Sequence, residues 1–167
     1  MQQQLIIRPA VEADFPAVAR ITGDSYLSAG YFDDAAHPYM AKIMDVGARA
    51  RQATIWVAER QGTVIGSVTL ARAGEPYADI ALHDELEFRM LVVDPAVQRS
   101  GAGRAMVDAI ISHARTLPGI RGVSLTTGQD WESAHGLYRK TGFQRVPERD
   151  WFVPGTDTKL LVYRRDL

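Results

Sequence analysis

Apolar positions recur along this chain of 167 residues with two different spacings. Alternating or continuous apolar runs rich in β-branched residues predict strands, and apolar residues three and four positions apart predict amphipathic helices. About seven strands are expected, at 5–8, 54–59, 63–71, 85–93, 123–127, 143–146 and 159–164. Helices are expected at 13–28, at 38–51, from the glycine-rich turn near 103 to about 116, and at 131–141.

The connections between these elements predict how the strands pair. Arg60-Gln61-Gly62 separates two β-rich runs and is typical of a hairpin, so the flanking strands should be antiparallel. Strands that alternate with helices after position 85 indicate parallel pairing there. The pattern therefore predicts an α/β protein with a mixed, mostly antiparallel central sheet and helices on both of its faces.

Composition narrows the class of protein. A length of 167 residues favours one domain over 1–167, and 46% hydrophobic with 23% charged residues is ordinary for a globular chain. A net charge of -1 gives no reason to expect a nucleic-acid partner. The chain has no cysteine, which excludes disulfides and an acyl-cysteine intermediate. With no signal peptide or membrane-length apolar run, we expect a cytoplasmic protein without a membrane partner.

The four histidines show no ligand spacing, and no metal is expected. They lie at positions 37, 83, 113 and 135, too scattered for an H-x-x-x-H pair on one helix face.

The segment after the strand at 85–93 gives the clearest indication of a ligand-binding site. Its glycines at 101 and 103 open a predicted helix, whose first N–H groups lack partners within the helix and lie at its positive end. Glycine lets a ligand approach the backbone where a Cβ would block it. Such a turn favours binding of a pyrophosphate. The residues expected to contact it are Gln98, Arg99, Ser100, Gly101, Ala102, Gly103 and Arg104.

The glycine-rich turn also has interpretations other than this pyrophosphate site. The segment could be only a helix entry, with Ser100 as its N-cap. A P-loop needs a Gly-Lys pair, which the chain lacks, and the dinucleotide fingerprint G-x-G-x-x-G/A fails at Met106. The pattern that fits is Gln-x-x-Gly-x-Gly, filled by Gln98, Gly101 and Gly103.

This pattern resembles the acetyl-CoA loop of the GCN5-related N-acetyltransferase superfamily. The preceding Val93-Asp94-Pro95 looks like the family's Val-x-Pro, and 134–143 (AHGLYRKTGF) looks like its second motif, with a strand between the two. The likeness covers about 85–145 well, and the first half only in general layout. It implies acetyl-CoA as cosubstrate, a sheet splayed open between the fourth and fifth strands (the acyl-CoA N-acyltransferase fold), and a homodimer as a common assembly.

The resemblance also implies roles for single residues. Backbone groups of Leu91 and Val93 would meet the pantetheine arm. Tyr138 would be the general acid that protonates the departing thiolate; the alternative is a core aromatic with its hydroxyl hydrogen-bonded. Trp131 stands where the family often has an Asn that contacts the arm, so any contact there would come from indole packing.

A general base is needed because an alkyl ammonium, with a pKa of about 10.4, is almost fully protonated at neutral pH. Glu85, Glu87 and Arg89 alternate along a strand and share one face. Glu87 is the preferred base, because this face would line the acceptor side in the resembling family; the alternative is a solvated strand face. The alternative bases, all in loops, are Asp33, Asp34 and His83.

The expected reaction is direct transfer of an acetyl group from acetyl-CoA to a primary amine, in a small molecule or a peptide. Two alternatives stay open: a sensor that binds acyl-CoA without turnover, and a nucleotide-binding protein. Aromatic residues in or beside loops would either form the amine pocket or close the ends of the core. They are Tyr26, Tyr31, Phe32, Tyr39, Tyr77, Trp151 and Phe152.

Overall fold

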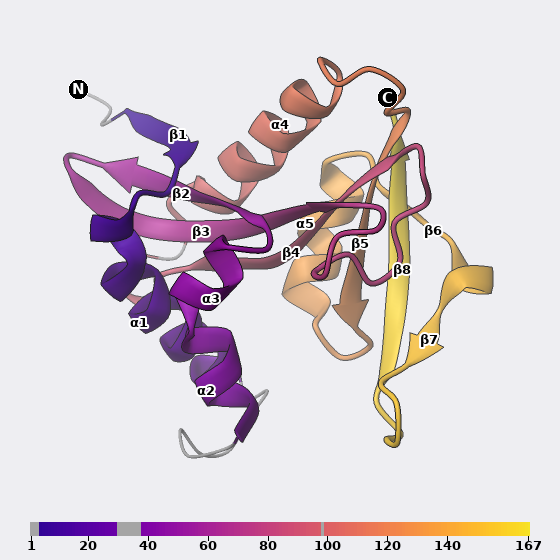
Figure 1. The fold of residues 1–167 in the computed structure, drawn as a ribbon, viewed down its shortest axis with the longest axis horizontal. Helices are drawn as coiled ribbons and strands as arrows, with labels where there is room; N and C mark the ends of the chain where they lie inside the picture. The colour runs from indigo at the N-terminus through magenta and orange to yellow at the C-terminus, as the bar shows by residue number, and fades with distance from the viewer. Residues whose placement is uncertain (1–3, 30–37, 98) are drawn as a thin grey trace. The chain divides into compact units, whose positions relative to one another are not determined.

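The computed structural model describes residues 4–29, 38–97 and 99–167 (Figure 1). The chain divides into two compact units. The first unit consists of Met1–Leu70 and Met90–Met106, and the second of Ala71–Arg89 and Val107–Leu167. Strand β4 (Glu85–Val93) and helix α4 (Ala102–Ala114) each contribute residues to both. The single domain over 1–167 that the length favours stays a prediction.

The first unit is built on an antiparallel meander. Strand β1 (Leu5–Pro9) pairs with β2 (Thr54–Arg60), and β2 pairs with β3 (Thr63–Arg72). Gln61 and Gly62 join the last two strands with φ angles of 51° and 77°. Positive φ at both central residues defines a type I′ turn, whose twist matches that of the flanking strands. The predicted hairpin is therefore confirmed.

Helices of the first unit lie along these strands (Figure 1). They are α1 (Phe15–Ser28), which follows the short η1 (Glu12–Asp14), α2 (Pro38–Met44) and α3 (Val46–Ala50). The single helix expected at 38–51 is wrong, because it is broken at Asp45. The Asp45 carboxylate accepts the N–H of Ala48 at 3.1 Å and so starts α3 as its N-cap. Behind the helices a core forms from Val18, Ile21, Val46, Ile55, Val57, Val64 and Val92.

The second unit holds the parallel pairing. Strand β5 (Gly122–Gly128) runs parallel to β4 and antiparallel to β8 (Lys159–Asp166). Two very short strands, β6 (Gln144–Arg145) and β7 (Trp151–Phe152), also pair with β8. The strand order is β1-β2-β3-β4-β5-β8-β6, with β7 on β8. The eighth strand, β7, was missed because two residues carry no periodic pattern.

The ladder between β4 and β5 ends early. It pairs Glu85–Phe88 with Gly122–Leu125, although β4 continues to Val93 and β5 to Gly128. Just beyond the last pair, Met90 has a φ of 55°, a left-handed conformation that interrupts the pleat of a strand. The end of the ladder at Phe88 is compatible with the splay expected between the fourth and fifth strands, which stays a prediction.

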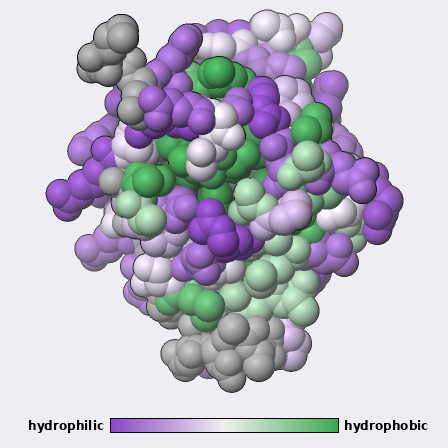
Figure 2. Space-filling model, turned by 90° about the vertical axis from the view of Figure 1, so that its left-hand side faces the viewer, coloured by the Kyte–Doolittle hydropathy of each residue, from purple (hydrophilic) through white to green (hydrophobic). Residues whose placement is uncertain are grey.

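The surface is ordinary for a globular protein. On the face drawn in Figure 2, hydrophilic residues surround an area near the middle where hydrophobic residues gather. The most exposed of the large hydrophobic side chains in the described ranges are Val11 and Phe152. None of the helices in the described ranges combines the length and the apolar character needed to cross a bilayer.

Candidate active site

The glycine turn leads from η2 (Pro95–Val97) into α4, within the first unit. Arg99 and Gly101 both have positive φ angles, of 65° and 83°. A Cβ built on Gly101 would meet no atom within 4 Å, so the space beside this backbone is open. An anion therefore has room to approach the turn, as a pyrophosphate requires. Gln98, named for the same role, lies outside the described residues.

The start of α4 supplies the hydrogen-bond donors. Ala105 N–H donates to the carbonyl of Gly101 at 3.0 Å, so the helix closes its first bond there. Ser100 Oγ accepts the N–H of Ala102 at 3.3 Å. Gly101 is nevertheless the N-cap, because its carbonyl accepts the first intrahelical bond, so the assignment of Ser100 as N-cap is wrong. The N–H group of Gly103 precedes the first intrahelical bond and is available to a ligand by helix geometry. The contact between Ser100 and Ala102 is therefore compatible with anion binding at this turn.

The charged side chains of the turn face solvent, and a third arginine fixes its backbone. Arg99 and Arg104 are exposed. Arg60, at the end of β2, donates through Nη2 to the carbonyl of Ser100 at 3.0 Å. This contact was not predicted, because nothing near Arg60 in the sequence points to a residue forty positions away.

The edge of β4 that faces away from β3 carries Leu91 and Val93. Asp94 N–H donates to the carbonyl of Ile65 on β3 at 2.8 Å. Since backbone groups alternate between the two edges of a strand, those of Leu91 and Val93 point to the opposite edge. The Val93 carbonyl already accepts Ser25 Oγ at 2.9 Å, and its second lone pair can accept another donor.

Tyr138 lies in the second unit, on α5 (Glu132–Lys140), within an aromatic cluster. Its ring centroid is 5.9 Å from Phe88, in an edge-to-face arrangement, and 5.9 Å from Tyr163. Phe143 completes the cluster at 6.1 Å. The side chain is 6% exposed, so packing fixes the ring. The cluster fits the core interpretation of the ring and leaves the proton-donor role as a proposal.

Trp131 occupies the N-cap position of α5 and packs within its own unit. A Cβ on Gly128 would overlap the Trp131 ring, so the indole lies directly on this glycine at the end of β5. His135 adds a second tie, because its Nε2 lies 2.8 Å from the carbonyl of Gly128. These contacts anchor the start of α5 to β5. A contact between the half-buried indole and acetyl-CoA stays a prediction.

Glu87 is fully buried, with 0% exposure. Its Oε1 accepts the N–H groups of Ile80 and Ala81, both at 3.0 Å, and its Oε2 accepts the N–H of Asp79 at 3.2 Å. Burial raises the pKa of Glu87, and the three amide hydrogen bonds oppose that rise only in part. The solvated strand face considered as an alternative is therefore wrong.

The loop before β4 covers the shared face of Glu85, Glu87 and Arg89. Arg89 Nη1 donates to the carbonyl of Tyr77 at 3.2 Å, and its Nη2 lies 3.3 Å from Asp79 Oδ2. Glu85 accepts the N–H of Leu82 at 3.0 Å. The prediction that these three side chains share one face is confirmed. Their contacts with residues 77–82 were not predicted.

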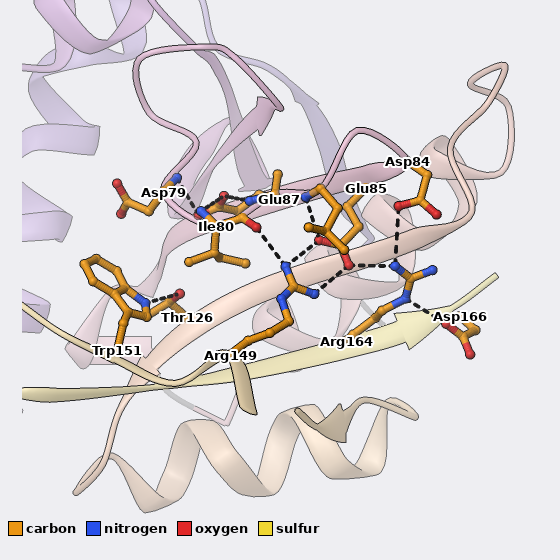
Figure 3. A network of polar contacts seen from close by, with 12 residues as sticks. Asp79, Ile80, Asp84, Glu85, Glu87, Thr126, Arg149, Trp151, Arg164 and Asp166 are labelled. Atoms are coloured by element: carbon orange, nitrogen blue, oxygen red, sulfur yellow. Dashed lines mark hydrogen bonds and ion pairs between the residues drawn. The ribbon is translucent and has the colours of Figure 1, made fainter. Parts of the chain in front are cut away.

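Glu85 is the centre of an ion-pair network on the same face (Figure 3). Arg149, in η3 (Pro147–Arg149), makes two contacts of 2.8 Å with its two oxygens, and Arg164 donates to Oε2 at 2.7 Å. Burial alone would raise the pKa of Glu85, but the hydrogen bonds from Arg149, Leu82 N–H and Arg164 outweigh it and hold the pKa at about 2. This network was not predicted.

The remaining candidates are divided between the two units or lie outside the described residues. Tyr26 and Tyr39 are half-buried in the first unit, and Tyr77, Trp151 and Phe152 belong to the second. Trp151 Nε1 donates to Thr126 Oγ1 at 3.4 Å (Figure 3), while Phe152 is 57% exposed. His83 is exposed. The described residues do not include Tyr31, Phe32, Asp33, Asp34 and His37.

The mixed sheet with its short parallel ladder, together with the glycine turn that opens α4, defines the acyl-CoA N-acyltransferase fold. The sequence pattern of the acetyltransferase (GNAT) family matches residues 16–143. The chain belongs to this family.

Named relatives agree with this assignment. Mycothiol acetyltransferase of Cellulomonas flavigena is 35% identical over 119 residues, which cover 66% of this chain and 34% of that protein. N-alpha-acetyltransferase RimI of Mycobacterium tuberculosis is 33% identical over 107 residues, covering 63% of this chain and 61% of that one. The aligned part thus amounts to less than two thirds of either relative's length.

Solved structures show the same fold over nearly the whole chain. A ribosomal-protein-alanine N-acetyltransferase from Brucella melitensis superposes with a TM-score of 0.71 at 22% identity, covering 97% of this chain and 99% of that one. The Salmonella typhimurium protein yncA, solved with its cofactor acetyl-CoA, gives a TM-score of 0.69 at 20% identity, covering 98% and 94%.

Proposed function

We propose that this protein is an N-acetyltransferase that moves an acetyl group from acetyl-CoA to a primary amine by direct attack. The observation that carries the proposal is the open turn at Gly101, at the start of α4, in a chain of the acetyltransferase family. Relatives of this chain are named mycothiol acetyltransferase and N-acetylaspartate synthetase, two names that refer to different compounds. The names support acetyl transfer and leave the amine open.

The proposed binding residues follow from the geometry of the first unit. The N–H group of Gly103 would bind the pyrophosphate at the positive end of α4, and the Arg99 and Arg104 side chains would add charge. The backbone of Leu91 and Val93 would hydrogen-bond the pantetheine arm along the edge of β4. The contribution of Arg60 would be to hold the turn in its binding conformation through the Ser100 carbonyl.

Acetyl-CoA supplies the acetyl group as a thioester. Tyr138 would donate its phenolic proton to the sulfur as the thiolate departs, because a thiolate leaves more easily when a neighbouring acid protonates it. Packing of the Tyr138 ring against Phe88 and Tyr163 would keep the hydroxyl in one place.

Glu87 would accept the proton that the amine loses. Its raised pKa brings the carboxyl nearer to neutral pH, where a general base is most effective. Because the carboxylate is fully buried, proton transfer requires that residues 79–81 move or that water reaches Glu87 from the acceptor.

A second function, binding of acetyl-CoA without turnover, is favoured by the hydrogen bonds of Glu87. Both oxygens of Glu87 already accept backbone N–H groups, as expected of a carboxylate that only holds a loop. A protein that binds acetyl-CoA and does not turn it over would need nothing more. The homodimer, the absence of nucleic-acid and metal partners, and the cytoplasmic location all stay predictions.

A combined binding and turnover experiment tests the proposal. Acetyl-CoA should raise the melting temperature more than ATP or NAD at equal concentration, and free thiol should appear when the protein receives acetyl-CoA and a panel of primary amines. Stabilisation without thiol release on any amine would favour the sensor. Stronger stabilisation by ATP or NAD would favour a nucleotide-binding protein.

A further inference from the structure

We infer that Arg149 is a positioning residue that controls Glu87 through the peptide group between Ile80 and Ala81. The inference rests on the proposed function, in which Glu87 takes the proton from the amine. Arg149 would touch neither substrate, and its role would be to fix the orientation and proton affinity of a residue that does.

One backbone residue joins the two side chains. Ile80 N–H donates to Glu87 Oε1 at 3.0 Å, and the carbonyl of the same residue accepts Arg149 Nη2 at 2.7 Å (Figure 3). The Ile80 carbonyl lies in the same planar peptide group as the N–H of Ala81, which also donates to Glu87 Oε1 at 3.0 Å. A charged donor on this carbonyl therefore leaves the Ala81 N–H little freedom to turn away. The contact at the Ile80 carbonyl therefore helps to keep the amides of residues 79–81 directed at the carboxylate.

Arg149 is itself held rigidly. Its two terminal nitrogens meet the two oxygens of Glu85 at 2.8 Å each, a bidentate pair with a carboxylate that is fully buried. Arg164 donates to the same carboxylate at 2.7 Å. Since the fork of a guanidinium defines direction as well as charge, lysine cannot reproduce both the Glu85 pair and the Ile80 bond.

Two charged groups act directly on Glu87, namely Asp79 of the loop and Arg149 of η3. Glu85 and Arg89 share its face of β4, and Arg164 of β8 pairs with Glu85. Removing the Arg149 cation would take one positive charge from this group, while Asp79 remains as an anion beside Glu87. It would also loosen the peptide group between Ile80 and Ala81. Both changes disfavour the charged form of Glu87, so its pKa should rise.

The test is a direct titration of Glu87 in the full chain. The side-chain carboxyl carbons of glutamate are labelled with carbon-13, the Glu87 signal is assigned by its loss in Glu87→Gln, and its chemical shift is followed against pH. Arg149→Met and Arg149→Lys are compared with Arg145→Met. Arg145 is a matched control, because it lies four residues before Arg149 and also binds a carboxylate and a carbonyl. Its partners are Asp150 and the Val162 carbonyl. In the described part of the chain it has no hydrogen bond to Ile80 or Glu85.

We expect Arg149→Met to raise the proton affinity of Glu87 about threefold or more, Arg149→Lys to raise it less, and Arg145→Met to leave it unchanged. If Arg149→Met does not fold, the titration of Glu87 in Arg149→Lys tests the inference. An unchanged Glu87 titration in the folded Arg149 variants, or an equal rise in Arg145→Met, would overturn the inference. The proposed role of Glu87 fails by a different result, namely unchanged turnover in Glu87→Gln.

Discussion

The carboxylate of Glu87 and the ring of Tyr138 lie on opposite faces of strand β4. Tyr138 packs edge-on against Phe88 at 5.9 Å, while the preceding residue, Glu87, points to the loop amides of residues 79–81. Neighbouring side chains of a strand point to opposite faces, so the pleat itself separates the two groups. Both positions adjoin the last pair of the β4–β5 ladder, Phe88 with Leu125.

Replacing Tyr138 with phenylalanine should lower turnover about 100-fold, because the proton donor is lost while the ring contacts with Phe88, Phe143 and Tyr163 remain. Acetyl-CoA affinity and melting temperature should change little. Initial rates of thiol release and calorimetric titration measure the two effects. Tyr163→Phe, in the same aromatic cluster, is the control and should keep its rate. Equal rates for Tyr138→Phe and the unmodified protein would remove the acid role.

Gly101→Ala should weaken acetyl-CoA binding at least tenfold. The new Cβ would occupy the open space beside the turn, and alanine is strained at a φ of 83°. Gly119→Ala is a close control, because Gly119 has a φ of 79°, has the same open surroundings and lies in the turn after α4. Both variants should lose about 1 kcal/mol of stability. Equal affinities in the two, by calorimetry, would contradict pyrophosphate binding at this turn.

Glu85 should make the free energy of unfolding depend on pH in acid. Its pKa is about 2 in the folded protein, below the ordinary value of 4.5. A lowered pKa contributes stability that is present above pH 4.5 and is lost as the pH falls from 4.5 towards 2. At pH 7, Glu85→Gln should cost about 3 kcal/mol, because Arg149 and Arg164 lose their shared carboxylate.

Urea titrations between pH 7 and pH 2.5 compare the unfolding free energies of the unmodified protein and of Glu85→Gln. The difference in unfolding free energy should shrink steadily below pH 4.5. A difference that stays constant with pH would mean that the Glu85 carboxylate is not stabilised by its arginine partners.

The amide protons of Asp79, Ile80 and Ala81 should exchange slowly with solvent, because all three donate to a buried carboxylate. In Glu87→Ala their exchange should quicken by about tenfold or more, while amides of the β5–β8 ladder keep their rates. Hydrogen exchange followed by mass spectrometry or NMR measures both. If the three amides already exchange at the rate of an open loop in the unmodified protein, Glu87 does not hold the loop.

Local chemistry explains what the sequence could predict. The Gln61-Gly62 hairpin depends on two adjacent residues that tolerate positive φ, and the glycine turn depends on residues within a single helix start. The parallel placement of β5 followed from the helix between two strands. Features of this kind are encoded over a few consecutive residues.

Contacts between distant segments explain what the sequence could not predict. The amides that bind Glu87 belong to a loop without a regular pattern, and Arg149 reaches Glu85 from 64 positions away. The left-handed conformation of Met90 has no local signal either, because methionine has no preference for positive φ. The break at Asp45 was missed because the apolar spacing continues across it.

Isotope transfer tests the central claim most directly. The purified protein is incubated with acetyl-CoA labelled with carbon-13 in the acetyl group, together with the panel of primary amines, and the amines and the intact protein are then weighed by mass spectrometry. We predict a labelled acetyl group on at least one amine, in amounts equal to the thiol released, with the protein mass unchanged. A label that stays on coenzyme A with every amine, or that accumulates on the protein, would contradict direct transfer.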